Sequence, residues 1–134
     1  MTTILVAAEA SWIRDQVTTA FAGSGQTVVE VKRGQDVRDS VAQHAPDLVV
    51  LDMQIANMGG VACAIDLRME AAEGRVPPTK ILLLLDREAD RFLAKRADAD
   101  AELLKPVDAA TLRRTIDRLV SEGATTGEPE TVDG

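Results

Sequence analysis

The chain has 134 residues, of which 46% are hydrophobic and only 2% aromatic, and its net charge is −7. This is the length of a single domain with an aliphatic core, and the acidic balance without a basic cluster argues against nucleic-acid binding. The single cysteine excludes an intrachain disulfide, and no apolar run approaches the ~20 residues of a membrane span. With no cleavage-like site near the N-terminus, we expect a cytoplasmic protein without a membrane segment.

Five short apolar runs are predicted to form β-strands. In chain order they cover residues 4–7, 27–31, 48–51, 81–85 and 102–104. The first, third and fourth are almost continuously apolar, which is typical of strands buried on both faces of a parallel sheet. The second is interrupted by Glu30 and followed by Lys32, as expected of an edge strand.

Amphipathic stretches between and after these runs predict five helices. Their apolar faces carry Ile13, Val17, Ala20 and Phe21, then Val37 and Val41, then Val61, Ile65 and Leu67, then Ala89, Phe92, Leu93 and Ala97, and last Leu112, Ile116, Leu119 and Val120. Asp108 is the expected N-cap of the last helix. The alternation predicts an α/β fold, (βα)5 and doubly wound, with helices on both faces of a parallel sheet. We assign residues 1–122 to this domain and residues 123–134, which have little to bury, to a disordered acidic tail.

Polar residues follow the predicted strands at the edge where ligands bind in such sheets. Glu9 follows the first strand, Asp52 the third, Asp86 the fourth and Lys105 the fifth. Carboxylates hold a hard divalent ion, and a lysine pairs with phosphate oxygens. Their joint placement indicates a phosphoryl site.

Two segments carry a resemblance to a known family. Residues 45–60, which contain Asp52 and end in Gly60, and residues 103–106, Leu-Leu-Lys-Pro, resemble the receiver domain of bacterial response regulators. The resemblance covers roughly residues 3–121 and implies a five-stranded sheet in the order 2-1-3-4-5. It also implies that Asp52 is the phosphoacceptor, that Lys105 senses the phosphate, and that Mg²⁺ is held by Glu9, Asp52 and the backbone carbonyl of Gln54.

The chain also departs from the family pattern. Ala8 stands where the first of two acids is usual, which predicts a weakened Mg²⁺ site. Leu83 or Leu84 occupies the place of a Thr or Ser that would hydrogen-bond the phosphoryl group, and Glu102 replaces a conformational aromatic. Ala56 takes the place of a loop proline. The sequence therefore predicts an atypical receiver.

Two functions compete at this point. The first is a signalling module, not an enzyme, that takes a phosphoryl group from a sensor histidine kinase or a small phosphodonor and acts through a protein partner. The second is a pseudo-receiver that serves as a phosphorylation-independent interaction or dimerisation module. A flavin-binding or hydrolase function is a third reading, but the few aromatics (Trp12, Phe21 and Phe92) are poorly placed to stack a flavin.

Further residues suggest secondary roles. The charges between Asp86 and Arg118 lie on the predicted fourth helix, fifth strand and fifth helix, a face through which the family often forms symmetric dimers, and we expect a dimer or partner surface there. His44 is expected to cap a helix or face solvent, and Cys63 to be a buried thiol.

Overall fold

Strands and helices alternate along the chain. The computed structural model describes residues 2–21, 25–55 and 58–125. In order, the elements are β1 (Thr3–Ala7), α1 (Ser11–Ala20), β2 (Thr27–Val31), α2 (Val37–His44), β3 (Leu48–Asp52), α3 (Gly60–Ala72), β4 (Lys80–Leu85), α4 (Arg91–Arg96), β5 (Ala101–Leu104) and α5 (Ala109–Thr125). The short 3-10 helices η1 (Gly34–Asp36) and η2 (Glu88–Asp90) precede α2 and α4.

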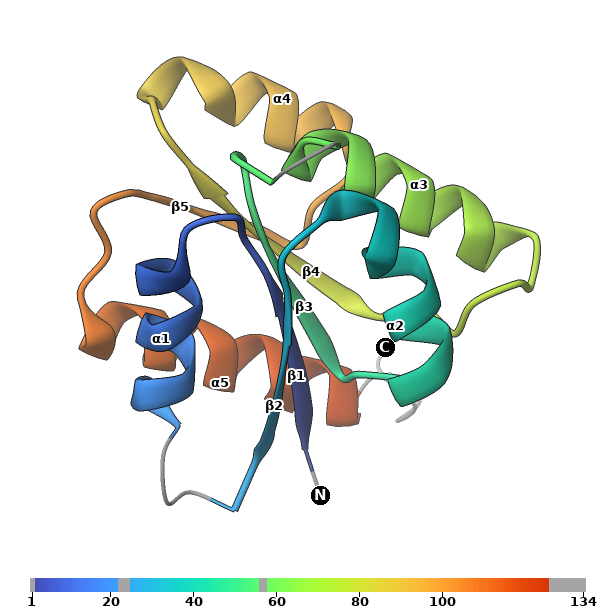
Figure 1. Ribbon diagram of the computed structural model, residues 1–134, viewed down its shortest axis with the longest axis horizontal. Helices are drawn as coiled ribbons and strands as arrows, with labels where there is room; N and C mark the ends of the chain where they lie inside the picture. The colour runs from blue at the N-terminus through green and yellow to red at the C-terminus, as the bar shows by residue number, and fades with distance from the viewer. Residues whose placement is uncertain (1, 22–24, 56–57, 126–134) are drawn as a thin grey trace, which may run out of the picture.

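The five strands form one parallel sheet in the order β2-β1-β3-β4-β5 (Figure 1), which confirms the predicted fold class. Every residue of β3 is buried, as is β4 from Ile81 onward. β2 lies at one edge and is partly exposed, as its interrupted apolar pattern predicted. The long apolar runs therefore mark the centre of the sheet because both of their faces are covered.

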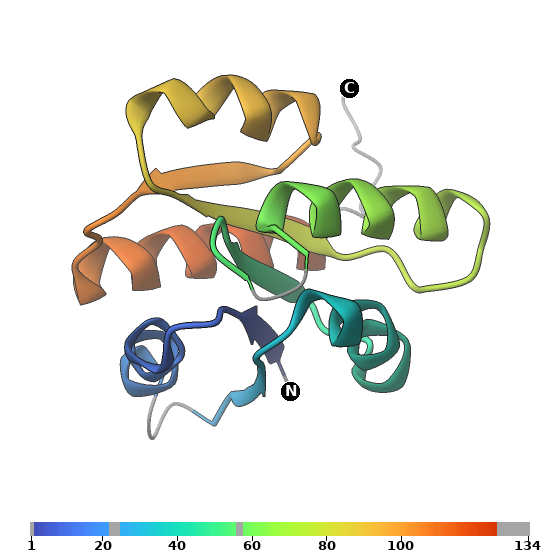
Figure 2. The same ribbon diagram turned by 45° about the horizontal axis from the view of Figure 1, so that its top comes forward.

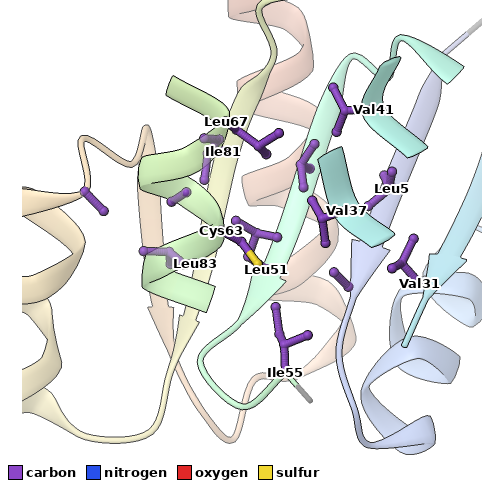
Figure 3. Close-up of a cluster of buried hydrophobic side chains, with 14 of the residues drawn as sticks. Leu5, Val31, Val37, Val41, Leu51, Ile55, Cys63, Leu67, Ile81 and Leu83 are labelled. Atoms are coloured by element: carbon purple, nitrogen blue, oxygen red, sulfur yellow. The ribbon is translucent and has the colours of Figure 1, made fainter. Parts of the chain in front are cut away.

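Side chains alternate along each strand between two hydrophobic clusters, one on each face of the sheet. One cluster lies under α2, α3 and α4, and the other under α1 and α5. Figure 2 shows these two groups of helices on either side of the sheet. In the first cluster Leu5, Leu51 and Leu83, from three neighbouring strands, meet Val37 of α2 and Leu67 of α3 (Figure 3). Each fully buried side chain of this kind contributes roughly 1.5–3 kcal/mol to folding.

The predicted apolar faces are correct for α1, α2 and α5 but partly wrong for α3 and α4. In α3, Cys63 and Leu67 are buried, whereas Ile65 is 42% exposed. In α4, Ala94 is buried and Phe92 is 60% exposed. The prediction favoured large side chains, but these helices turn some of their small residues toward the sheet, where close packing has little room for larger ones.

The last helix begins at the predicted cap. The Thr111 backbone N–H donates to Asp108 Oδ1 at 2.7 Å. The helix extends to Thr125, three residues beyond the predicted domain end at 122, while residues 126–134 of the predicted tail, like Ala56, lie outside the described residues. Of the helices described, none has the length and apolar character needed to cross a bilayer.

Cys63 is a buried thiol, as predicted. The residue is 1% exposed, and its Sγ lies 3.7 Å from the Met58 carbonyl oxygen and 3.9 Å from that of Gly34. Burial raises the pKa of the Cys63 thiol to about 11. At pH 8 only about one thiol in a thousand would then be the reactive thiolate.

We therefore expect iodoacetamide to alkylate the native protein at least ~100-fold more slowly than the denatured chain at pH 8. Intact mass spectrometry over time measures both rates, and the signal is unambiguous because the chain has one cysteine. Equal rates in the two states would contradict the buried, protonated thiol.

Candidate functional site

The carboxyl ends of β1, β3, β4 and β5 meet at one rim of the sheet. The parallel register places Ala7 beside Leu51, Asp52 beside Leu84 and Leu85 beside Leu104. Beyond the strand ends, backbone hydrogen bonds continue across the rim: Glu9 N–H to the Gln54 carbonyl (3.2 Å), Met53 N–H to that of Leu84 (3.0 Å) and Lys105 N–H to that of Leu85 (2.9 Å). The loops that carry the predicted site residues are thus tied to one another.

Asp52 is the buried carboxylate of this rim. It ends β3 and is only 1% exposed. Its Oδ1 is in direct contact with Lys105 Nζ, while its Oδ2 is buried and has no hydrogen-bond partner in the described part of the chain. Burial raises the pKa of Asp52, and the hydrogen bond from Lys105 offsets this only in part. A buried acceptor oxygen without a partner is unusual and suggests that a ligand belongs there.

Lys105 lies between two carboxylates. Besides Asp52, its Nζ contacts Asp86 Oδ1 at 2.7 Å. Burial alone would lower the pKa of Lys105, but the hydrogen bonds to Asp52 and Asp86 outweigh it and raise that pKa, so the ammonium stays charged. The same hydrogen bond, with one from Gln54, lowers the pKa of Asp86. The predicted meeting of Asp52 and Lys105 is therefore found, and Asp86 joins them.

The residues expected to hold a metal reach the same rim but do not form a closed cluster. Glu9 is exposed, and its backbone N–H occupies the Gln54 carbonyl that was expected to face a metal. The Gln54 side-chain amide turns instead to Asp86, donating to Oδ2 at 2.9 Å. Among residues 2–21, 25–55 and 58–125, no group of three or more His, Cys, Asp or Glu side chains is placed to hold a metal ion.

Arg14 belongs to this region and was missed by the sequence reasoning. It is 7% exposed, and its Nη1 donates to the carbonyls of Ala8 (2.7 Å) and Glu9 (2.9 Å). Its Nε lies 3.4 Å from Glu30 Oε1 on β2. The arginine thus fixes the segment after β1 that contains Ala8 and Glu9. The available signal was its place on α1 beside Ile13, on the buried face of that helix.

On β4 the structure shows which leucines approach the site. Leu83 and Leu84 are both buried, Leu83 toward α3 and Leu84 toward α1 and α5. Leu85 shares the face of Leu83, ends the strand, and its carbonyl accepts the Lys105 N–H. None of the residues of β4 carries a hydroxyl, so this strand offers the site no side-chain donor of that kind.

On β5, Glu102, at the position where the resemblance implies an aromatic, forms an ion pair. Glu102 Oε2 accepts a hydrogen bond from Arg91 Nη1 at 3.0 Å, and Arg91 also binds Glu88 at 2.8 Å. β5 is thus linked to the start of α4 by charge.

Gly60 packs tightly against the backbone of Asp52. It is the first residue of α3, and a Cβ added to it would collide with the carbonyl group of Asp52. Its N–H donates to the Met53 carbonyl at 3.3 Å. Only glycine lets α3 begin this close to Asp52 without a shift of the backbone.

Known proteins share this sequence pattern and fold. The profile of the response regulator receiver domain matches residues 4–117. Protein PilH of Pseudomonas aeruginosa is 27% identical over 121 residues, which cover 90% of this chain and 99% of PilH. The KDP operon transcriptional regulatory protein KdpE of Escherichia coli is 28% identical over 97% of this chain, which spans only 56% of KdpE.

The solved structures include that of the chemotaxis protein CheY4 of Vibrio cholerae. It matches with a TM-score of 0.77 at 22% identity, over 89% of this chain and 98% of that one, which shows the shared fold. The family profile covers most of the chain, and the fold agrees with it. The chain therefore belongs to the response regulator receiver domain family, the signalling modules of phosphorelay systems.

Proposed function

We propose that this receiver domain accepts a phosphoryl group on Asp52 and passes the signal to a protein partner. The observation that carries the proposal is the buried Oδ2 of Asp52, which has no hydrogen-bond partner among the described residues and lies beside the charged Lys105. One carboxylate oxygen of Asp52 is thus left without a partner among the described residues, and a cation lies beside the carboxylate to pair with an incoming phosphoryl group.

In the reaction, a carboxylate oxygen of Asp52 attacks the phosphorus of the donor in line with the leaving group. The new O–P bond forms as the bond to the imidazole of a phosphohistidine, or to acetate, breaks and its electron pair leaves with that group. Lys105 remains protonated throughout and pairs with the phosphoryl oxygens, which carry more negative charge than the carboxylate they replace.

Receiver domains generally bind Mg²⁺ at their acidic pocket, and the oxygen donors of this rim suit such a hard cation. Glu9, Asp52 and the carbonyl of Gln54, which keeps a second lone pair besides the one that accepts the Glu9 N–H, are the groups that would hold it here. When bound, Mg²⁺ neutralises negative charge on the transferring group. Because Ala8 supplies no carboxylate, we propose that this site is weaker than one with two acids after β1.

Receiver domains interact with histidine kinases and other signalling proteins. We propose a sensor histidine kinase as the donor and, because such kinases draw on ATP, the cytoplasm as the compartment. A symmetric dimer through α4, β5 and α5 stays a prediction. Several charges of that face pair within the chain, Arg91 with Glu102 (3.0 Å) and Arg118 with Glu122 (3.1 Å), and would have to exchange partners in a dimer.

The test is incubation with acetyl phosphate and Mg²⁺. We expect intact mass spectrometry to show the mass gain of one phosphoryl group, located on the peptide that contains Asp52. Replacing Mg²⁺ by EDTA is expected to slow the mass gain at least ~10-fold, because no metal ion then neutralises the negative charge on the transferring group. A protein that gains no phosphoryl group under either condition would support the pseudo-receiver function, which the comparisons do not favour.

A further inference from the structure

Asp86 occupies a position in the site that the proposed phosphoryl transfer does not use. It is the first residue after β4, and its side chain is 34% exposed. Its two carboxylate oxygens bind different partners, Oδ1 the Lys105 ammonium at 2.7 Å and Oδ2 the Gln54 side-chain amide at 2.9 Å. Lys105, the cation that would pair with the phosphoryl group on Asp52, is thus already shared between Asp52 and Asp86.

Asp86 is also joined to the start of α4. The next residue, Arg87, donates its backbone N–H to Asp90 Oδ2 at 3.0 Å, and Asp90 is 3% exposed. Arg87 is the N-cap of η2, which ends at Asp90 and leads directly into α4. A displacement of Asp86 would therefore move the segment 86–90 and the beginning of α4.

Apart from the contact between Lys105 and Asp86, the side chains of β4 and β5 provide few polar links between Asp52 and α4. β4 has no hydroxyl to reach the site, and Glu102 on β5 is paired with Arg91. Among the described residues, polar side-chain contacts run from Asp52 through Lys105 to Asp86, from Gln54 to Asp86, and from Arg91 to Glu102.

A phosphoryl group on Asp52 would change the balance of charge around Lys105. It brings roughly −1.5 to −2 charges and three strong acceptor oxygens, so Lys105 would be drawn to it. Asp86 would lose its pairing and face a like charge at short range. Since its side chain is partly exposed, it can turn toward water at little cost.

We propose that Asp86 is the switch residue of this receiver. In the unphosphorylated chain, Lys105 pairs with both Asp86 and Asp52. After phosphorylation, Lys105 pairs with the phosphoryl group instead, and Asp86 moves out of the site together with the segment 86–90. This inference rests on the proposed function of Asp52. Asp86 would also disfavour phosphorylation of Asp52, because its negative charge repels the incoming phosphoryl group.

The experiment compares wild type, Asp86→Asn and Glu88→Gln in titrations with beryllofluoride and Mg²⁺, followed by amide NMR spectra. Glu88→Gln is the matched control because it removes the same charge two residues along the segment, from a side chain that pairs with Arg91 rather than Lys105. We expect Asp86→Asn to bind beryllofluoride about tenfold more tightly than wild type, since a like charge near the group is gone. Glu88→Gln should stay within about twofold.

The spectra supply the second readout. In wild type, binding should shift the amides of residues 86–91, and unliganded Asp86→Asn should already be displaced toward the bound positions of wild type. If wild type binds but Asp86→Asn binds equally or more weakly, or if Glu88→Gln gains as much, the role of Asp86 is wrong while the function of Asp52 stands. If wild type neither binds beryllofluoride nor takes a phosphoryl group, the proposed function fails and the role of Asp86 with it.

Discussion

Replacing Asp52 with asparagine is expected to abolish phosphoryl incorporation completely and, at the same time, to raise the free energy of unfolding. The loss follows because the attacking carboxylate oxygen is gone. The gain follows because Asp52 is 1% exposed, with one oxygen that has no hydrogen-bond partner among the described residues. Burying such a charge costs free energy that the neutral amide largely avoids. Lys105 is not left unpaired, since Asp86 lies 2.7 Å away.

We expect a stabilisation of about 1–2 kcal/mol at neutral pH, measured by urea unfolding in EDTA. The pKa of Asp52 is raised in the fold, so its contribution to stability is complete below the unfolded pKa of about 3.9 and is lost as pH rises through the folded pKa. The advantage of Asp52→Asn should therefore be largest near neutral pH and shrink toward about pH 4.

Asp98→Asn is the control for this experiment. It makes the same chemical change at a side chain that is 90% exposed and far from the rim, at a positive φ of 58° that asparagine also tolerates. It should still accept the phosphoryl group and change stability by no more than about 0.5 kcal/mol. A destabilised Asp52→Asn protein would show that the native ion pair outweighs the cost of burying the charge.

Replacing Gly60 with alanine is expected to destabilise the fold by about 2–3 kcal/mol and to slow phosphorylation. The added Cβ would overlap the Asp52 carbonyl group and lie 3.3 Å from the Cα of Met53. Because these are backbone atoms, the start of α3 or the end of β3 must move, and Asp52 moves with it. Urea unfolding measures the first effect, and the rate of mass gain with acetyl phosphate measures the second.

Gly59→Ala is the matched control, one residue earlier in the same loop. Its Cβ would lie 3.5 Å from the Met53 carbonyl oxygen, an ordinary contact, and its φ of −63° suits alanine. We expect a change within about 0.5 kcal/mol, or a slight stabilisation from the less flexible unfolded chain. Equal effects of the two substitutions would contradict the close approach at Gly60.

If Asp86 acts as proposed, this receiver would couple its phosphoryl site to α4 mainly through charged side chains. Lys105 with Asp86 and Arg91 with Glu102 connect the rim to α4. Such contacts, being partly exposed, would be weaker at high ionic strength than a packed aromatic.

The local pattern of the sequence determined much of this protein. Continuous apolar runs predicted the buried strands, and the interrupted run predicted β2 at the edge. A strand covered on both faces needs an apolar side chain at every position, whereas an edge strand tolerates polar ones. Asp52 and Lys105 were placed at one rim by a general rule: the carboxyl ends of parallel strands share an edge. The N-cap at Asp108 and the burial of the Cys63 thiol were likewise predicted from the neighbouring sequence.

Only the tertiary structure decided which side chains contact one another at that rim. Lys105 is 53 residues from Asp52, and Gln54 is 32 from Asp86, so their contacts depend on the register of β3, β4 and β5 together. The burial of Arg14 and the exposure of Phe92 likewise follow from how each helix turns against the sheet. The periodicity of the sequence predicts which face of an element a side chain lies on. Its contact partners depend on long-range packing, because they come from segments that only the complete fold brings together.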